Sequence, residues 1–313
     1  VEAKKYKKSD YGVYKWDVVN KTRLIKMSDE NRVFFKKLFI NTKYNIKPYI
    51  NIEKGQLSKI DYDHPFLKMD NNYYKVYFEL ERNHWWFLAR NEIIRSQVEE
   101  LYQSNGGPLK IINVGVATGA TSEMLANFGE VTSIEYEQDC IDYTKSKIDI
   151  DIQLGTILDL KYPDETFDLV CSFDVIEHVE NDQLAASELI RVCKKDGFVF
   201  ITVPAFMSIW SQHDVINHHV KRYVISEIHA LFSNVLVRKY VSYFNFPLSI
   251  PIFIVRFFDR LIPGNIKRNK TNSDFDVVSN AWLNKLFYKI FISEKAFIKK
   301  KFHFPFCFLF LII

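Results

Sequence analysis

The sequence predicts an α/β fold with a doubly wound, mostly parallel sheet. Three short apolar runs, Ile111–Val114, Phe167–Phe173 and Phe198–Val203, have the β-branched and aromatic composition of strands that are buried on both faces. Helical patterns separate these runs, and strands that alternate with helices form parallel sheets. Ligands of such sheets bind at the carboxyl ends of the strands. The residues that follow each run are therefore the first candidates for a site.

The run Ile111–Val114 opens a unit of strand, tight turn, helix and second strand. Gly115 and Gly119 allow the chain to turn sharply and to bring bare backbone against a ligand. Glu135 ends the second strand, 20 residues after Gly115. An acidic side chain at this spacing accepts hydrogen bonds from the hydroxyls of a ribose. The unit predicts binding of a nucleoside.

The turn departs from the dinucleotide-binding fingerprint. Ala117 occupies the middle position, and the glycine expected three residues further on is missing, because that position is Ala120. The fingerprint needs these glycines for close approach of a pyrophosphate. The turn is therefore not expected to cradle phosphate groups.

A second unit begins with Phe167–Phe173 and places Asp174 at the carboxyl end of that strand. Residues 182–193 are expected to form a helix. Its packing side would carry Leu184, Leu189, Ile190 and Val192. The sequence Lys194–Gly197 is expected to end this helix with cations and then a glycine.

Two further blocks frame these units. Residues 81–90 read Glu-Arg-Asn-His-Trp-Trp-Phe-Leu-Ala-Arg, and residues 203–223 contain a proline-alanine turn, the pair His213-Asp214 and the cluster His219-x-x-Arg-Tyr. Together the four blocks resemble the class I S-adenosylmethionine (SAM)-dependent methyltransferases, and in particular a bacterial subgroup with the last two blocks. The resemblance implies a Rossmann-like fold with seven strands in the order 3-2-1-4-5-7-6 and an antiparallel seventh strand. It also implies that residues 81–90 form a helix before the first strand.

The resemblance implies a donor site around the glycine turn, with SAM as cofactor, S-adenosylhomocysteine as product and no metal. Glu135 would bind the ribose, and Arg90 either binds the methionine carboxylate or only packs. Thr156 either bonds near the adenine or holds its own loop. The implied donor-binding residues are Trp86, Arg90, Asn113, Gly115, Ala117, Gly119, Glu135, Tyr136, Thr156, Ile157, Asp174 and Val175. Asn113 stands where the family usually has a carboxylate.

Three histidines are the candidate catalytic residues. His178 follows the strand Phe167–Phe173 closely, and it either takes a proton from a hydroxyl acceptor or bonds a backbone carbonyl as a structural residue. His213 and His219 could form a second polar cluster over the acceptor, with Asp214 orienting one of them. A metal site is the rival interpretation, but no cysteine or Glu-x-x-His pattern completes it. We expect acceptor binding or loop ordering.

Composition and charge limit the class of protein. The chain has 313 residues, of which 48% are hydrophobic, so it can bury a sizeable core. Residues 1–80 carry 17 basic and 10 acidic side chains, whereas the whole chain has a net charge of +4. This basic leader suggests an anionic partner, or it reflects biased residue usage. The four cysteines lack the paired spacing of a zinc site, and a cytoplasmic location is expected.

The expected organisation is a basic extension over residues 1–70, of unknown role, followed by a methyltransferase domain over residues 71–313. A hydrophobic insertion at about residues 244–301 would precede the last strand, which is expected within residues 304–313. The apolar part of this insertion is too short to span a bilayer. A peripheral membrane contact through residues 244–262, a lid over the acceptor and a buried helix pair all stay open.

The sequence as a whole predicts a methyltransferase that moves a methyl group from SAM to a small or lipid-like acceptor, at an oxygen atom. One alternative is a non-catalytic SAM-fold protein that serves as a scaffold, because Asn113 and Ala117 alter the glycine turn. A second is a dinucleotide-dependent oxidoreductase, which the missing phosphate-binding glycine disfavours. Nucleic acid is not an expected partner, because the basic residues form no stripe beside a base-binding motif.

Overall fold

The computed structural model describes residues 52–53, 56–57, 71–232, 240–249, 280–304 and 309–312. The chain divides into two units, Val1–Lys68 and Met69–Ile313. In the first unit, strands β1 (Ile52–Glu53) and β2 (Gln56–Leu57) form an antiparallel pair. The sheet and the candidate site belong to the second unit.

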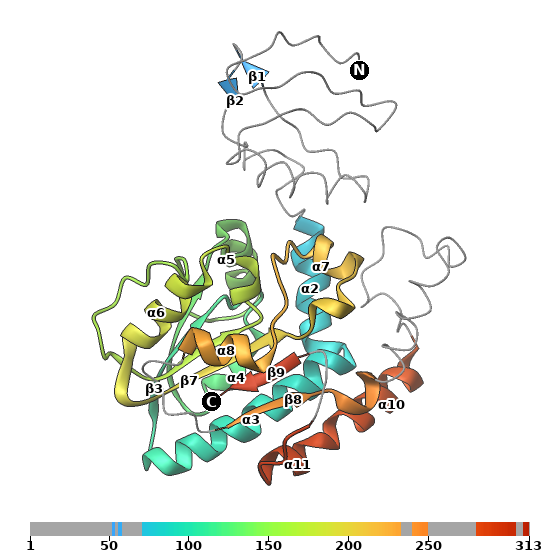
Figure 1. The fold of residues 1–313 in the computed structure, drawn as a ribbon. Helices are drawn as coiled ribbons and strands as arrows, with labels where there is room; N and C mark the ends of the chain where they lie inside the picture. The colour runs from blue at the N-terminus through green and yellow to red at the C-terminus, as the bar shows by residue number, and fades with distance from the viewer. Residues whose placement is uncertain are drawn as a thin grey trace, which may run out of the picture. The chain divides into compact units, whose positions relative to one another are not determined.

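A seven-stranded sheet forms the centre of the second unit (Figure 1). In spatial order its strands are β5 (Ile152–Leu154), β4 (Gly129–Glu135), β3 (Leu109–Val114), β6 (Phe167–Phe173), β7 (Cys193–Pro204), β9 (Leu309–Ile312) and β8 (Val241–Phe244). Pairs from β5 to β7 are parallel, and β9 runs antiparallel to both β7 and β8. The predicted mostly parallel α/β fold is confirmed, and numbering the strands along the chain gives the order that the resemblance implies.

Helices cover both faces of the sheet. They are α2 (Asn71–Asn83), α3 (Trp85–Asn105), α4 (Ala120–Leu125), α5 (Gln138–Lys145), α6 (Asp182–Val192), α7 (Gln212–Ile216), α8 (Ile225–Phe232), α10 (Ala281–Ile292) and α11 (Glu294–Lys299), with 3₁₀ turns η1 (Ile176–His178) and η2 (Met207–Ile209). Ile112 and Val170 share one core cluster with residues of α6 and α8. Ile111 and Leu169 share another with residues of α3, α10 and α11. Successive side chains of a strand point to opposite faces, so both faces are buried.

The block of residues 81–90, expected to be one helix, spans the end of α2 and the start of α3. His84 lies between them in an extended conformation, and its side chain accepts a hydrogen bond from the backbone N–H of Trp86 at 3.3 Å. Such a cap satisfies an N–H that the first turn of a helix leaves unpaired. The expectation of a single helix was wrong. The second helix begins after His84, and histidine is not among the residue types that usually mark the start of a helix.

The end of α6 also differs from the expectation. Leu184 is 41% exposed, whereas the predicted Leu189 and Val192 are buried, together with Ala185 and Ala186. The chain leaves the helix directly at Cys193, which already has the extended conformation of β7. Gly197 therefore lies inside β7, where a Cβ atom would come within 2.9 Å of the carbonyl oxygen of Asp168. The glycine permits close strand packing rather than a helix cap.

The described part of the region at residues 244–301 packs on the domain. Asn284 of α10 accepts a hydrogen bond from the N–H of Trp85 at 2.8 Å and donates to the carbonyl oxygen of Asn83 at 2.9 Å. Glu294 accepts from the backbone N–H groups of Asn245 and Phe246, both at 2.5 Å. Residues 250–279, with most of the proposed membrane-contacting segment, lie outside the described residues. No described helix combines the length and apolar character needed to span a membrane.

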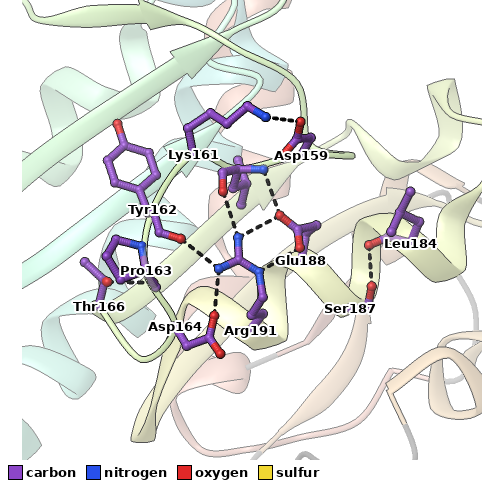
Figure 2. A network of polar contacts seen from close by, with 11 residues as sticks. Asp159, Lys161, Tyr162, Pro163, Asp164, Thr166, Leu184, Ser187, Glu188 and Arg191 are labelled. Carbon is purple, nitrogen blue, oxygen red and sulfur yellow. Dashed lines mark hydrogen bonds and ion pairs between the residues drawn. The ribbon is translucent and has the colours of Figure 1, made fainter.

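Arg191 of α6 fastens the loop that follows β5 (Figure 2). Its guanidinium donates to the carbonyl oxygens of Leu160 and Tyr162, each at 2.7 Å, and pairs with Glu188. Glu188 in turn accepts the backbone N–H of Leu160 at 2.8 Å. These bonds raise the pKa of Arg191 and lower the pKa of Glu188, so both stay charged. The network holds the segment that begins with Thr156 and Ile157.

We predict that Arg191→Met lowers the free energy of unfolding by about 1–3 kcal/mol, because two backbone carbonyls lose their donor. Denaturant titration followed by circular dichroism measures this change. Lys195→Met is the matched control, because the Lys195 side chain is 83% exposed and only approaches Glu165 at 3.7 Å. The control should change stability by less than about 0.5 kcal/mol. Equal effects of both substitutions would contradict the role of the network.

Candidate active site

The turn between β3 and α4 has a backbone that few residue types tolerate. Gly115, Ala117 and Gly119 have φ of 74°, 48° and 84°. A Cβ atom at Gly115 would lie 2.3 Å from Cγ2 of Val175, the second residue after β6. Glycine at 115 is therefore required both by the left-handed conformation and by the close approach of the segment after β6.

Glu135 joins this turn to the end of β4. Its Oε2 accepts the N–H of Ala117 at 2.7 Å, and its Oε1 accepts the N–H groups of Tyr136 at 2.8 Å and Glu137 at 3.2 Å. Burial raises the pKa of Glu135, and these three N–H donors oppose the shift. Oε2 accepts one of these bonds, so it retains capacity to accept a hydroxyl.

Asn113 supports the turn from inside the protein. Its Nδ2 donates to Oγ1 of Thr121 at 2.9 Å and to Oγ of Ser122 at 3.0 Å, both in α4. Ser133 of β4 bonds the same Ser122 hydroxyl at 2.8 Å. The amide of Asn113 therefore fixes α4 on the sheet, and its side-chain nitrogen is already used within the protein.

The predicted adenine-side residues differ in exposure. Ile157 is 4% exposed and packs in the core, whereas Tyr136 is 74% exposed. The hydroxyl of Thr156 accepts the N–H of Leu158 at 3.2 Å. Ile157 is thus mainly a core residue, and the loop interpretation of Thr156 agrees with this bond.

Arg90 and Asp174 form an ion pair at the carboxyl end of β6. Nη2 of Arg90 lies 2.7 Å from Oδ2 of Asp174 and 3.2 Å from Oγ1 of Thr202, which itself donates to Oδ1 of Asp174 at 2.9 Å. Arg90 is 4% exposed, and its guanidinium carbon lies 5.2 Å from the ring centre of Trp86. Its Nε has no hydrogen-bond partner among the described residues. A buried guanidinium with a spare donor is suited to bind a carboxylate.

Helix α2 contributes contacts that the sequence did not predict. Thr118 in the turn donates its hydroxyl hydrogen to Glu81, and Arg82 donates to the carbonyl oxygen of Thr118 at 3.1 Å. The hydroxyl of Tyr74 donates to Glu137 at 2.7 Å. Glu81 and Arg82 are the first two residues of the block 81–90, so that block was the feature of the sequence that could have predicted these contacts. Burial raises the pKa of Glu81 to about 7.

The three predicted catalytic histidines lie together beside η1. The ring centres of His178 and His219 are 4.8 Å apart, and those of His213 and His219 are 6.2 Å apart. Nδ1 of His219 lies 2.9 Å from Oδ1 of Asp214, and Nε of Arg222 lies 2.6 Å from the same oxygen. Burial alone would raise the pKa of Asp214, but its bonds from His219 and Arg222 hold it well below the ordinary value. Asp214 therefore stays ionised and orients His219.

His178 is poorly suited to act as a general base by itself. Desolvation by the surrounding protein, together with the neighbouring His219 and His218, lowers the pKa of His178 to about 3. The side chain still exposes enough surface to reach solvent. A base with such a low pKa holds a proton weakly near neutral pH. The structure thus disfavours proton abstraction by His178 and leaves it a neutral imidazole.

Glu177 is an acidic residue of the same region that the sequence did not single out as a site. It is 0% exposed, and neither carboxylate oxygen has a hydrogen-bond partner among the described residues. Burial, and after it the charge of Asp174, raises the pKa of Glu177 well above its ordinary value.

Comparison with known proteins relates this site to a family of enzymes. Residues 112–201 match the family model described as a methyltransferase domain. A probable S-adenosylmethionine-dependent methyltransferase from Mycolicibacterium smegmatis is 23% identical over 126 residues, which cover 40% of this chain and 47% of the relative. A ubiquinone biosynthesis O-methyltransferase from Rickettsia akari is 29% identical over 158 residues, 49% of this chain and 60% of that protein.

Residues 112–201 thus form a methyltransferase domain that resembles those of the class I SAM-dependent methyltransferases. A phosphatidylethanolamine N-methyltransferase from Cereibacter sphaeroides is a further relative, 28% identical over 100 residues that cover 29% of this chain and 49% of the relative. The chain spans about half the length of the first relatives it matches, at 47% and 49%. The family match includes β3, the glycine turn and β6, which form the centre of the methyltransferase domain.

The residues of this methyltransferase domain fit SAM, the cofactor of the family. Oε2 of Glu135 can accept a ribose hydroxyl, and the missing Cβ at Gly115 leaves the backbone of the turn open to close approach. The unpartnered Nε of Arg90 suits the methionine carboxylate. The twelve predicted donor residues remain predictions.

We predict that Glu81 makes stability depend on pH. Its pKa is raised to about 7 in the folded state, so the folded protein binds more protons than the unfolded chain between about pH 4.5 and 7. The stability contribution is therefore complete at low pH and is lost as pH rises through about 7. Relative to the wild type, Glu81→Gln should gain about 2–3 kcal/mol of unfolding free energy between pH 5 and 8.

Denaturant titrations at several pH values measure this difference, in which other titrating groups cancel. Glu79→Gln, an exposed position on the same helix, is the control and should follow the wild-type curve. Parallel curves for Glu81→Gln and wild type would show that Glu81 does not carry the effect.

Proposed function

We propose that this domain transfers a methyl group from SAM to an oxygen atom of a small or lipid-like acceptor. The observation that carries the proposal is the Glu135 carboxylate, which binds the glycine turn and β4 together while keeping an acceptor position for a ribose hydroxyl. The family match supports the donor, and the nature of the acceptor is inferred from the surrounding side chains.

The proposed reaction is an in-line displacement. The acceptor oxygen forms a bond to the methyl carbon as the bond from that carbon to the sulfonium sulfur breaks, S-adenosylhomocysteine leaves, and the hydroxyl proton passes to water. Such a reaction depends mainly on holding the two reactants in line. Arg90 and Asp174 would hold the charged methionine end of the donor, and Glu135 would hold the ribose.

The histidines favour an oxygen acceptor. His178 lies just beyond β6, in the same short segment that places Val175 against the glycine turn, and His219, held by Asp214, lies beside it. Imidazole nitrogens form hydrogen bonds with hydroxyl groups. The printed names of two relatives include an O-methyltransferase and an N-methyltransferase, so relatives alone do not choose between oxygen and nitrogen.

Aromatic side chains near the sheet edge favour an acceptor with apolar surface. Phe206 and Tyr243 stack with ring centres 5.1 Å apart, and Phe246 and Phe304 stack at 5.6 Å. Apolar and aromatic walls with a few polar groups are typical of sites for small molecules. A peripheral membrane contact through residues 244–262 would suit a lipid-like acceptor and is part of this proposal.

We predict that Glu135→Ala weakens SAM binding by about 100-fold, because a buried charged acceptor for the ribose is lost. Calorimetric titration with SAM and with S-adenosylhomocysteine measures the affinity. Glu130→Ala is the matched control, because Glu130 is exposed at the other end of the same strand.

A folded wild-type chain that fails to bind SAM would overturn the proposal and favour the scaffold alternative. Wild-type affinity in the Glu135→Ala variant would show that the donor lies elsewhere. Transfer of radioactive methyl from bound SAM to hydroxyl-bearing rather than amine-bearing acceptors then tests the choice of oxygen.

A further inference from the structure

Glu177 lies buried without a partner in a region that also presents histidine nitrogens. Both of its carboxylate oxygens lack hydrogen bonds within the described chain, and the residue is 0% exposed. Leaving a buried carboxyl unpaired costs several kcal/mol in general, so buried acids are usually paired or bind metals. A bound cation would therefore satisfy a carboxyl that has no partner among the described residues.

The neighbours of Glu177 are metal-binding groups. A carboxylate oxygen of Glu177, a ring nitrogen of His178 and a ring nitrogen of His219 all lie within 4.8 Å of one another. We propose that these three residues bind a divalent transition-metal ion such as Zn²⁺. Two imidazoles and one carboxylate form a ligand set found in zinc enzymes and other transition-metal sites.

His219 is oriented as metal-binding histidines usually are. Its Nδ1 is held by the Asp214 carboxylate at 2.9 Å, so Nε2 is the nitrogen left for a metal. A carboxylate on the far nitrogen fixes the ring and strengthens the imidazole as a ligand. Arg222 bonds both oxygens of Asp214, at 2.6 and 3.0 Å, and so fixes the carboxylate in turn.

The distances require a modest contraction around the ion. Zinc bonds of about 2.0–2.2 Å put tetrahedral ligand atoms about 3.3–3.6 Å apart. The atoms of the three side chains are within 4.8 Å of one another, so they would move inwards by about 1 Å. His178 is exposed, which gives the ion a path from solvent.

Glu177 is the carboxylate of this region that is left for an ion. Both of its oxygens are buried and lack hydrogen-bond partners among the described residues, so a bound cation would satisfy them. Asp174 itself is not needed as a ligand, because it is paired with Arg90 and Thr202.

The ion would also specify the acceptor, and this step rests on the proposed function. Three protein ligands leave at least one position open, as in catalytic zinc sites. A hydroxyl oxygen of the acceptor would occupy that position and lose its proton to water more readily, because a bound metal lowers the pKa of a coordinated O–H. The oxygen would then attack the methyl carbon as the bond to sulfur breaks. The acceptor class is thus a compound whose hydroxyl can bind a metal ion.

The test is titration of the chelator-treated full chain with Co²⁺, followed by its visible absorption, and with Zn²⁺, followed by calorimetry. The wild type should bind one ion. Glu177→Gln and His219→Ala should each weaken binding by about 100-fold or more. His229→Gln, a histidine of α8 outside the three-ligand group, is the matched control and should bind as the wild type does.

SAM titration of each variant separates this proposal from the proposed function. Glu177→Gln and His219→Ala should bind SAM as the wild type does, which also shows that they are folded. A wild-type chain that binds SAM but neither Co²⁺ nor Zn²⁺ would overturn the metal site alone, as would equal metal binding by all variants. Metal binding without SAM binding would overturn the methyltransferase proposal and leave the metal site standing.

Discussion

The carboxylate of Glu135 is the constraint on which the donor side of the site depends. Strand β3 and strand β4 end side by side, and one acidic side chain accepts backbone N–H groups from the turn after each of them, at Ala117 and at Tyr136. Burial disfavours its charge, and the N–H donors favour it. Ala117 can therefore keep its left-handed φ of 48° in an ordered turn, because Glu135 accepts its backbone N–H.

The segment after β6 links this donor side to the histidine side. Asp174 has a left-handed φ of 58°, which turns the chain so that Val175 packs on Gly115 while Glu177 and His178 face away toward the loop of residues 217–223. The carbonyl oxygen of Glu177 accepts the N–H of Val220 at 2.7 Å and ties that loop to η1. Any group held by the histidines is thereby placed with respect to the turn that we propose to bind the donor, which is the positioning that methyl transfer needs.

The sequence predicted what depends on local pattern and missed what depends on tertiary contact. The apolar runs of β3, β6 and β7 were visible because strands buried on both faces need continuous hydrophobic residues. Strand β5 was not identified, since it has three residues and two of them are exposed. Glu177 was missed as a site because folding brings its neighbours together, and His219 lies far along the chain. The spacing of residues in the sequence also does not show that the carboxyl of Glu177 is buried.

The position of β9 has a consequence for synthesis. Among the described strands, β9 is the one that pairs with β8, and β9 is made after β8 but lies between it and β7. On the ribosome, β3 to β7 can assemble as soon as they emerge, whereas β7 stays an open edge until residues 309–312 appear. An open edge invites pairing with other chains. Strand β9 therefore covers the open edge of β7 and joins β8 to the sheet, which removes that edge as a site for pairing with other chains.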